Sequence, residues 1–171
     1  MDELDMVWSQ MLADAGEKAA GSGRHAVAEY LRLKATNDAI RSRGVAWLID
    51  AFVAMASAQQ GPRTDLTIIR EDPYRFERGT SRMVGSCVEI RHGVRCLSVA
   101  AGWARTPSDG IMRGGALAFA QITHFGMQKA GAELRLVHGN DLPQWLDDAG
   151  EPIDIDTVRG HIDLFLDRVV S

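Results

Sequence analysis

The hydrophobic pattern changes from helical to strand-like spacing at Pro62, and no other feature of the sequence constrains the fold as strongly. Before Pro62 the apolar residues recur every three or four positions, which is the spacing of an amphipathic helix. Beyond Pro62 they alternate with polar residues, as on a half-buried strand. Helical spacing returns near residue 154. We therefore predict an α+β fold with N-terminal helices, an antiparallel β-sheet of four to six strands and a C-terminal helix.

The three patterns follow one another without a linker or an internal repeat, so we expect a single α+β domain over residues 1–171. Its helical region, antiparallel sheet and C-terminal helix are expected at residues 1–60, 64–138 and 154–170. The sequence leaves open whether residues 24–60 form one helix or two. Between Val45 and Ala56 only Asp50 is polar, which predicts a helix in the middle of the fold.

The clearest local signal is a β-hairpin whose two-residue turn is predicted at His92-Gly93. In this register Arg91 pairs with Val94, and the apolar residues of both strands share one face of the sheet. Together with the apolar positions of two helices, that face supplies the predicted core, which comprises Trp47, Phe52, Val88, Ile90, Leu97, Val99, Ile162 and Phe165.

The same register separates the two cysteines of the chain. Cys87 faces Ser98 and Cys96 faces Glu89, so the thiols are diagonal neighbours that are poorly placed for a disulfide. Their spacing matches neither a redox motif nor a zinc motif, and the acidic N-terminus lacks the basic start of a signal peptide. We expect two reduced thiols and a cytoplasmic location.

A second hairpin is predicted where residues 126–131 join two further strand-like segments. In the expected register His124 faces Glu133, and His138 faces Phe119. A cross-strand ion pair with Glu133 would then explain His124 without any catalytic role.

The charge balance argues against two classes of partner. The net charge is −4 at pH 7 and the pI is near 5.7, whereas nucleic acids and anionic membranes attract basic proteins. The longest apolar stretch, residues 44–58, contains Asp50 and is shorter than the roughly 20 residues of a membrane-spanning helix. The common motifs of nucleotide, hydrolase and metalloprotease sites are also absent from the sequence. We expect no membrane partner, no cofactor and no metal.

One glycine-rich loop, residues 102–115, carries the residue types of a ligand site. Its candidate ligand-binding residues are Trp103, Arg105, Asp109 and Arg113. Arginines grip carboxylates and phosphates, a tryptophan ring offers a stacking wall, and glycines let backbone N–H groups approach an anion. The alternative is a connection whose glycines serve turn geometry and whose tryptophan packs on the core.

The predicted sheet segment is the only part of the chain with a positive balance. Residues 61–113 contain nine arginines and six acidic residues. Several arginines on one face of the sheet would form a site for an anionic ligand. Arginines that act separately instead keep the sheet solvated and protect its edges from aggregation.

Asp50 is the sharpest candidate for acid–base chemistry, because a charge on an apolar helix must be solvated, paired or protonated. In a cavity with His124 or His138 it would serve as a general base for a small organic substrate. On a solvated stripe, or beside an arginine of the sheet, it would have no catalytic role.

These observations favour a binding protein for a small acidic ligand or for a protein partner, which forms a homodimer through its sheet. The acid–base enzyme is one alternative. A nucleic-acid-binding regulator is another, and it would use Arg24, Arg32, Arg41 and Arg43. The first 60 residues carry eight acidic and six basic side chains, which argues against nucleic-acid binding.

Overall fold

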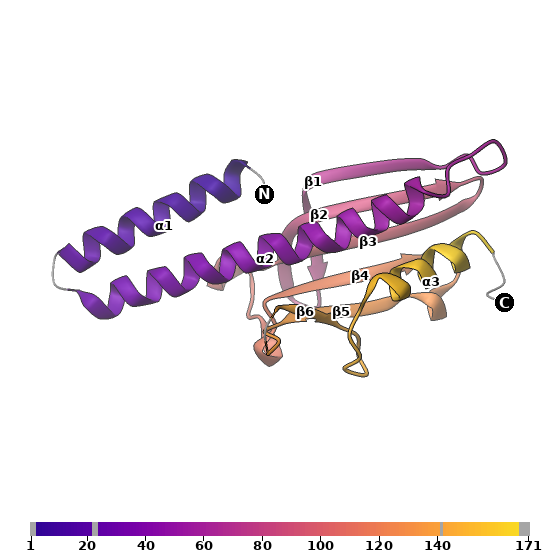
Figure 1. Ribbon diagram of the computed structural model, residues 1–171. Helices are drawn as coiled ribbons and strands as arrows, with labels where there is room; N and C mark the ends of the chain where they lie inside the picture. Colours follow the sequence, from indigo (N-terminus) through magenta and orange to yellow (C-terminus); the bar gives the residue numbers. More distant parts are fainter. Residues whose placement is uncertain (1–2, 22–23, 141, 168–171) are drawn as a thin grey trace. The chain divides into compact units, whose positions relative to one another are not determined.

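The computed structural model describes residues 3–21, 24–140 and 142–167, and the chain divides into two compact units, Met1–Arg43 and Gly44–Ser171. Over the described residues there are three α-helices and one six-stranded antiparallel sheet, which confirms the predicted α+β class (Figure 1). None of the described helices is both long and apolar enough to cross a membrane.

The first unit is a hairpin of two antiparallel helices (Figure 1). It contains α1 (Glu3–Gly21) and the beginning of α2 (His25–Ser57), which is one continuous helix over the range that the sequence left open. The two helices are packed at Gly16, where a Cβ would lie 3.6 Å from the carbonyl oxygen of Ala28, at ordinary van der Waals distance.

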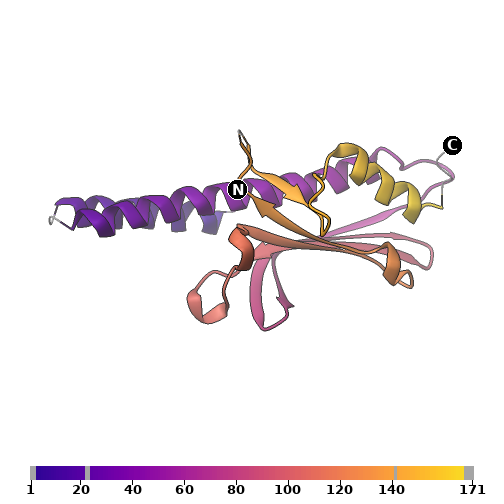
Figure 2. The same cartoon turned by 90° about the horizontal axis from the view of Figure 1, so that it is seen from below.

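The second unit is a meander sheet whose strands lie side by side in chain order. The strands are β1 (Thr67–Arg78), β2 (Ser81–His92), β3 (Arg95–Trp103), β4 (Ala118–His124), β5 (Ala132–Val137) and β6 (Gln144–Leu146). The part of α2 from Gly44 onward and α3 (Ile155–Phe165) lie on the same side of this sheet (Figure 2). Asp154 caps α3 by accepting a hydrogen bond from the backbone N–H of Thr157.

The core lies between these helices and the covered face of the sheet. Seven of the eight predicted core residues are buried, because each occupies the apolar face of its own element. The exception is Trp47, whose side chain is 43% exposed. The prediction that this helix lies in the middle of the fold was therefore wrong. Residues 44–57 cover only one face of the sheet, so one flank of the helix meets solvent.

The β2–β3 hairpin turns one residue later than predicted, at Gly93-Val94, with His92 paired to Arg95. The pairing consequently shifts by two residues, which leaves every side chain on its expected face. Cys87 pairs with Ala100 rather than with Ser98, and Cys96 pairs with Arg91 rather than with Glu89. The expected partners of both cysteines were therefore wrong. Both cysteines are free.

The β4–β5 register also differs from the prediction, and this difference moves side chains to the opposite face of the sheet. Glu133 pairs with Gln121, whereas His124 pairs with Leu97 on the other neighbouring strand. A shift by an odd number of residues turns side chains to opposite faces of the sheet. The predicted pairs His124–Glu133 and His138–Phe119 were therefore wrong. Residues 128–130 form a short 3₁₀ turn that lengthens the connection between the two strands.

The β1–β2 hairpin bends away from the helices at its far end (Figure 2). The pairing of β1 with β2 changes register between Glu71 and Tyr74, and Gly85 of β2 faces Gly102 of β3. A side chain on either glycine would collide with the backbone of the partner strand. Bare backbone at these two positions therefore lets the strands pass closely at the bend.

Candidate functional site

A second, smaller core fixes the bent end of the hairpin on the face of the sheet that the helices leave uncovered. Met83, Ala116 and Phe119 are buried there, and Phe76 and Met112 pack against them. These side chains come from β1, β2, β4 and the connection between β3 and β4. Apolar packing thus holds the connection against the hairpin and positions the charged residues around it.

A hollow of about 230 Å³ lies beside this second core, and we call it the arginine hollow. Three guanidinium groups line it, and they come from β1, β5 and the connection before β4. Three carboxylates and several apolar groups complete the wall. The lining residues are Arg78, Arg113, Gly114, Phe119, Glu133, Leu134, Arg135, Leu146, Asp147 and Asp148.

Arg78 is the most constrained of the three arginines. Its guanidinium carbon lies 3.8 Å from the centroid of the Phe119 ring, at cation–π distance. Its Nη2 lies 3.4 Å from Oε2 of Glu133. Its Nε is buried and has no hydrogen-bond partner among the described residues. A buried donor without an acceptor costs free energy, so an acceptor oxygen at this position would be stabilising.

The other two arginines of the hollow are exposed. Arg135 pairs with Phe119 across β4 and β5, and Arg113 precedes the left-handed Gly114 in the connection. Over the described part of the chain, neither arginine forms an ion pair. Of the acidic neighbours, Asp147 accepts hydrogen bonds from the backbone of its own turn. Two guanidinium groups therefore remain available to an incoming anion.

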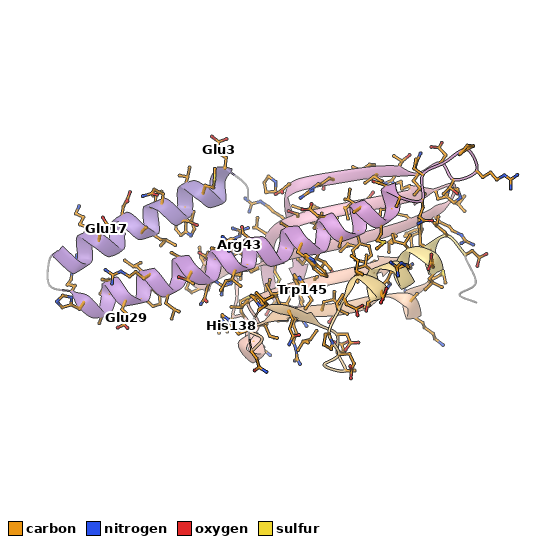
Figure 3. The ribbon with its side chains drawn as sticks, viewed as in Figure 1. Glu3, Glu17, Glu29, Arg43, His138 and Trp145 are labelled. Carbon is orange, nitrogen blue, oxygen red and sulfur yellow. The ribbon has the colours of Figure 1, made fainter. Side chains whose placement is uncertain are left out.

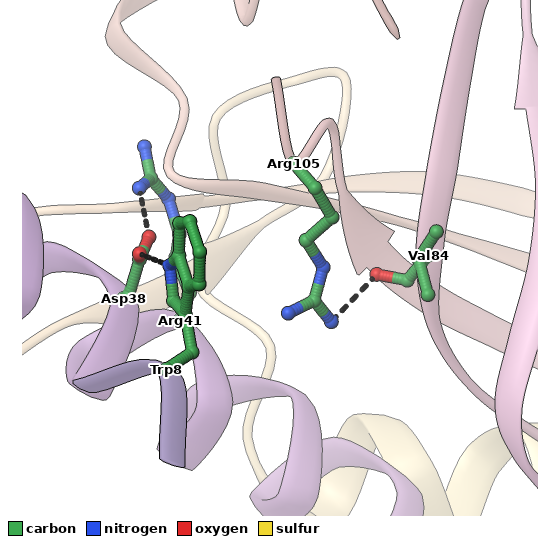
Figure 4. A network of polar contacts seen from close by, with 5 residues as sticks. All are labelled: Trp8, Asp38, Arg41, Val84 and Arg105. Atoms are coloured by element: carbon green, nitrogen blue, oxygen red, sulfur yellow. Dashed lines mark hydrogen bonds and ion pairs between the residues drawn. The ribbon is translucent and has the colours of Figure 1, made fainter. Parts of the chain in front are cut away.

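The four predicted ligand-binding residues of the loop do not line one common hollow. Trp103 lies at the end of β3 and is 3% exposed. The guanidinium carbon of Arg105 lies 3.6 Å from the centroid of the Trp103 ring, and its Nη2 donates to the carbonyl oxygen of Val84 at 3.1 Å (Figure 4). Stacking and hydrogen bonding of this kind connect the loop to the bent hairpin.

Asp109 contacts an arginine outside the predicted site. It accepts a hydrogen bond from the Thr106 hydroxyl at 2.9 Å and lies 3.5 Å from Nη2 of Arg82. It lines a separate hollow together with Arg75 and Arg82. Of the four predicted ligand-binding residues, only Arg113 lines the arginine hollow.

Two residues of the hollow, Arg78 and Arg135, were not proposed from the sequence as site residues. They are 57 positions apart on β1 and β5, and only the bend of the hairpin brings Arg78 to the face that carries Arg135. The available signal was the positive balance of residues 61–113, which includes Arg78 but not Arg135.

The proposed acid–base residues are also placed separately. Nη1 of Arg70 lies 2.8 Å from Oδ1 of Asp50, and both side chains are exposed. This confirms the interpretation of Asp50 as a charge paired with an arginine of the sheet. Over the described residues no hydrogen bond or ion pair joins Asp50 to His124 or to His138, and His138 is exposed beyond the end of β5 (Figure 3).

His124 contacts a histidine that the sequence did not single out. Its Nε2 lies 3.0 Å from Nδ1 of His161 on α3, beside the ring of Phe52. Burial lowers the pKa of His124. Burial, and then the neighbouring charge of His124, lowers the pKa of His161 to about 4. Both imidazoles are consequently neutral at pH 7, and one donates to the other, which favours a structural pair over a general acid or base.

In the ranges that the structure describes, no three His, Cys, Asp or Glu side chains gather as a ligand set. Comparisons with protein-family models, with curated proteins and with solved structures give no match for this chain.

Proposed function

We propose that the protein binds a small carboxylate or phosphate compound in the arginine hollow. The observation that carries the proposal is the state of its three guanidinium groups. Arg78 keeps a buried Nε without an acceptor among the described side chains, and Arg113 and Arg135 have no described ion-pair partner. Planar guanidinium groups at one site match the oxygen pairs of carboxylates and phosphates.

The acidic residues of the hollow narrow the class of ligand. Glu133, Asp147 and Asp148 balance the three arginines in formal charge, so an extended polyanion such as nucleic acid meets repulsion at the rim. A compact anion that also carries a hydrogen-bond donor meets favourable groups on both sides. Hydroxy acids and amino acids have this combination. These small molecules fit a hollow of about 230 Å³ better than an acidic protein surface would.

We also infer that the protein works in a reducing compartment. Cys87 and Cys96 are free thiols, which supports a reducing compartment such as the cytoplasm.

A thermal-shift panel tests the proposed function. Inorganic phosphate, malate, glutamate and glycerol phosphate are added to the full chain at millimolar concentration. A ligand at about 100 times its Kd stabilises a protein by about 2.7 kcal/mol, which is a rise in Tm of roughly 5–10 °C at this size. At least one compound of the panel is expected to give such a rise.

The variant Arg113→Ala/Arg135→Ala removes both available guanidinium groups and is expected to abolish the shift. Both positions are exposed, so the substitution changes stability by only about 0.5 kcal/mol. Arg63→Ala is the matched control, because it removes an equivalent exposed charge near the opposite end of β1 from Arg78. A panel without any shift, or a shift that the double variant retains, would overturn the proposal.

A further inference from the structure

The helical hairpin of the first unit buries little apolar surface. Among its described residues only two apolar side chains, Leu12 and Ala28, are buried, together with the polar Asp38 and Ser42. Its exposed large apolar residues are Met6, Val7, Trp8, Met11, Val27, Tyr30 and Leu33. A helix pair on its own has no enclosed core, and most helical stability in proteins comes from packing an apolar face against a partner.

Four of these side chains share one face of the hairpin. The indole N–H of Trp8 donates to Oδ2 of Asp38 at 3.2 Å, which places these two residues on the same side of the helix pair (Figure 4). Met11 follows Trp8 by three positions on α1. Tyr30 and Val27 precede Asp38 by eight and eleven positions on α2, so helical periodicity returns them to that side. We call Trp8, Met11, Val27 and Tyr30 the hairpin face.

The hairpin face is large enough for a dimer interface. Its four side chains are between 43% and 63% exposed. A helix of 19 residues is about 28 Å long and a helix pair is about 20 Å wide, so the outline of the whole hairpin covers about 560 Å². Stable protein interfaces bury about 600–1,000 Å² on each partner, so the hairpin has the size of a small interface.

The charge of the first unit indicates which kind of partner could cover the hairpin face. Residues 1–43 contain six basic and seven acidic side chains, and Arg41 is paired with Asp38 at 2.7 Å. Nucleic acids and anionic membranes require a basic surface, which this unit does not have. A nearly neutral surface with charges of both signs does not repel a second copy of itself.

We infer that the hairpin face is covered by the hairpin face of a second copy of this chain, so that two hairpins form an intermolecular four-helix bundle. The arrangement encloses Trp8, Met11, Val27 and Tyr30 of both copies in one apolar interface. The argument for this interface uses no residue of the arginine hollow, so the inference stands independently of the proposed function.

Light scattering of the full chain tests this inference. Wild-type protein at about 50–100 µM is expected to have a mass near twice 18.7 kDa. Met11→Glu/Tyr30→Glu places two charges in the interface and is expected to give a single copy. Met6→Glu is the matched control, because Met6 is 52% exposed on the same helix but on the opposite flank from Trp8. This control is expected to keep the mass of the dimer.

A wild-type mass of one copy at every concentration would overturn the inference, and so would a dimer that persists in the double variant. Hydrogen exchange of the wild-type protein supplies a readout that needs no substitution. Dilution below the dissociation constant is expected to raise exchange in residues 6–34 while residues 67–146 keep their protection. Dissociation without this local change would show that another surface joins the copies.

Discussion

The guanidinium of Arg78 lies 3.8 Å from the centre of the Phe119 ring, although two strands separate β1 from β4 in the sheet. Strands that are three places apart in a flat sheet lie about 14 Å from each other. The contact therefore exists because the β1–β2 hairpin bends over the uncovered face. The curvature of the sheet, rather than any local motif, builds the arginine hollow.

The bend depends on bare backbone at Gly85. An alanine there would overlap the carbonyl oxygen of Ala101 and lie 2.5 Å from the Cα of Gly102, and neither backbone atom can move freely. Gly85→Ala is expected to lower the free energy of unfolding by at least about 3 kcal/mol in urea titrations. Gly160→Ala is the control, because Gly160 lies on α3 with open space around it and should gain about 0.5–1 kcal/mol. A Gly85→Ala protein of wild-type stability would contradict this account of the bend.

Substitutions at Leu97 and Trp47 compare the stability contributed by a buried side chain with that of a partly exposed one. Leu97 is fully buried between β2 and β4, so Leu97→Ala is expected to cost about 2–5 kcal/mol of unfolding free energy. Trp47 is 43% exposed, and Trp47→Ala is expected to cost clearly less, although it removes more atoms. Chemical denaturation of both variants gives the comparison. A larger loss at Trp47 would place that flank of α2 in a buried environment.

Stability should depend on pH through His161. Its folded-state pKa of about 4 lies below the usual value of 6.5. Between these two pH values the unfolded chain therefore binds a proton at this histidine that the folded chain does not bind. The contribution of this histidine is complete above about pH 6.5 and is lost as the pH falls toward 4. Between pH 7.5 and pH 5 the loss should be about 1–2 kcal/mol. Urea titrations of the wild type and of His161→Gln measure it, and an equal pH dependence in both would be the contrary result.

The sequence predicted the elements of the fold well wherever periodicity alone decides the outcome. Alternation on β2 and β3 identified the buried face that contains Val88 and Leu97, because a register error of two residues keeps every side chain on its face. The same reasoning failed at His124, where the turn before β5 changes the register by an odd number. Strand β6 is only three residues long, which is too short to show a period.

The candidate site was less predictable for a physical reason. Composition pointed to arginines in the sheet segment, and Arg113 does line the hollow. Arg78 reaches the hollow through a bend whose sequence signals include Gly85 and Gly102, and isolated glycines in a strand do not show where a distant side chain will lie.

Nuclear magnetic resonance of the arginine Nε–H groups tests the central claim most directly. Titration of ¹⁵N-labelled protein with the panel compound that gives the largest thermal shift should move the Nε–H signal of Arg78, which Arg78→Lys identifies by its disappearance. The signal of Arg105, whose side chain stacks on Trp103 and donates to Val84, serves as the internal control and should stay in place. A saturable shift at Arg78, with the Arg105 signal unmoved, is the predicted result. Saturable binding that leaves the Arg78 signal unmoved would contradict the account, because the ligand would then lie elsewhere.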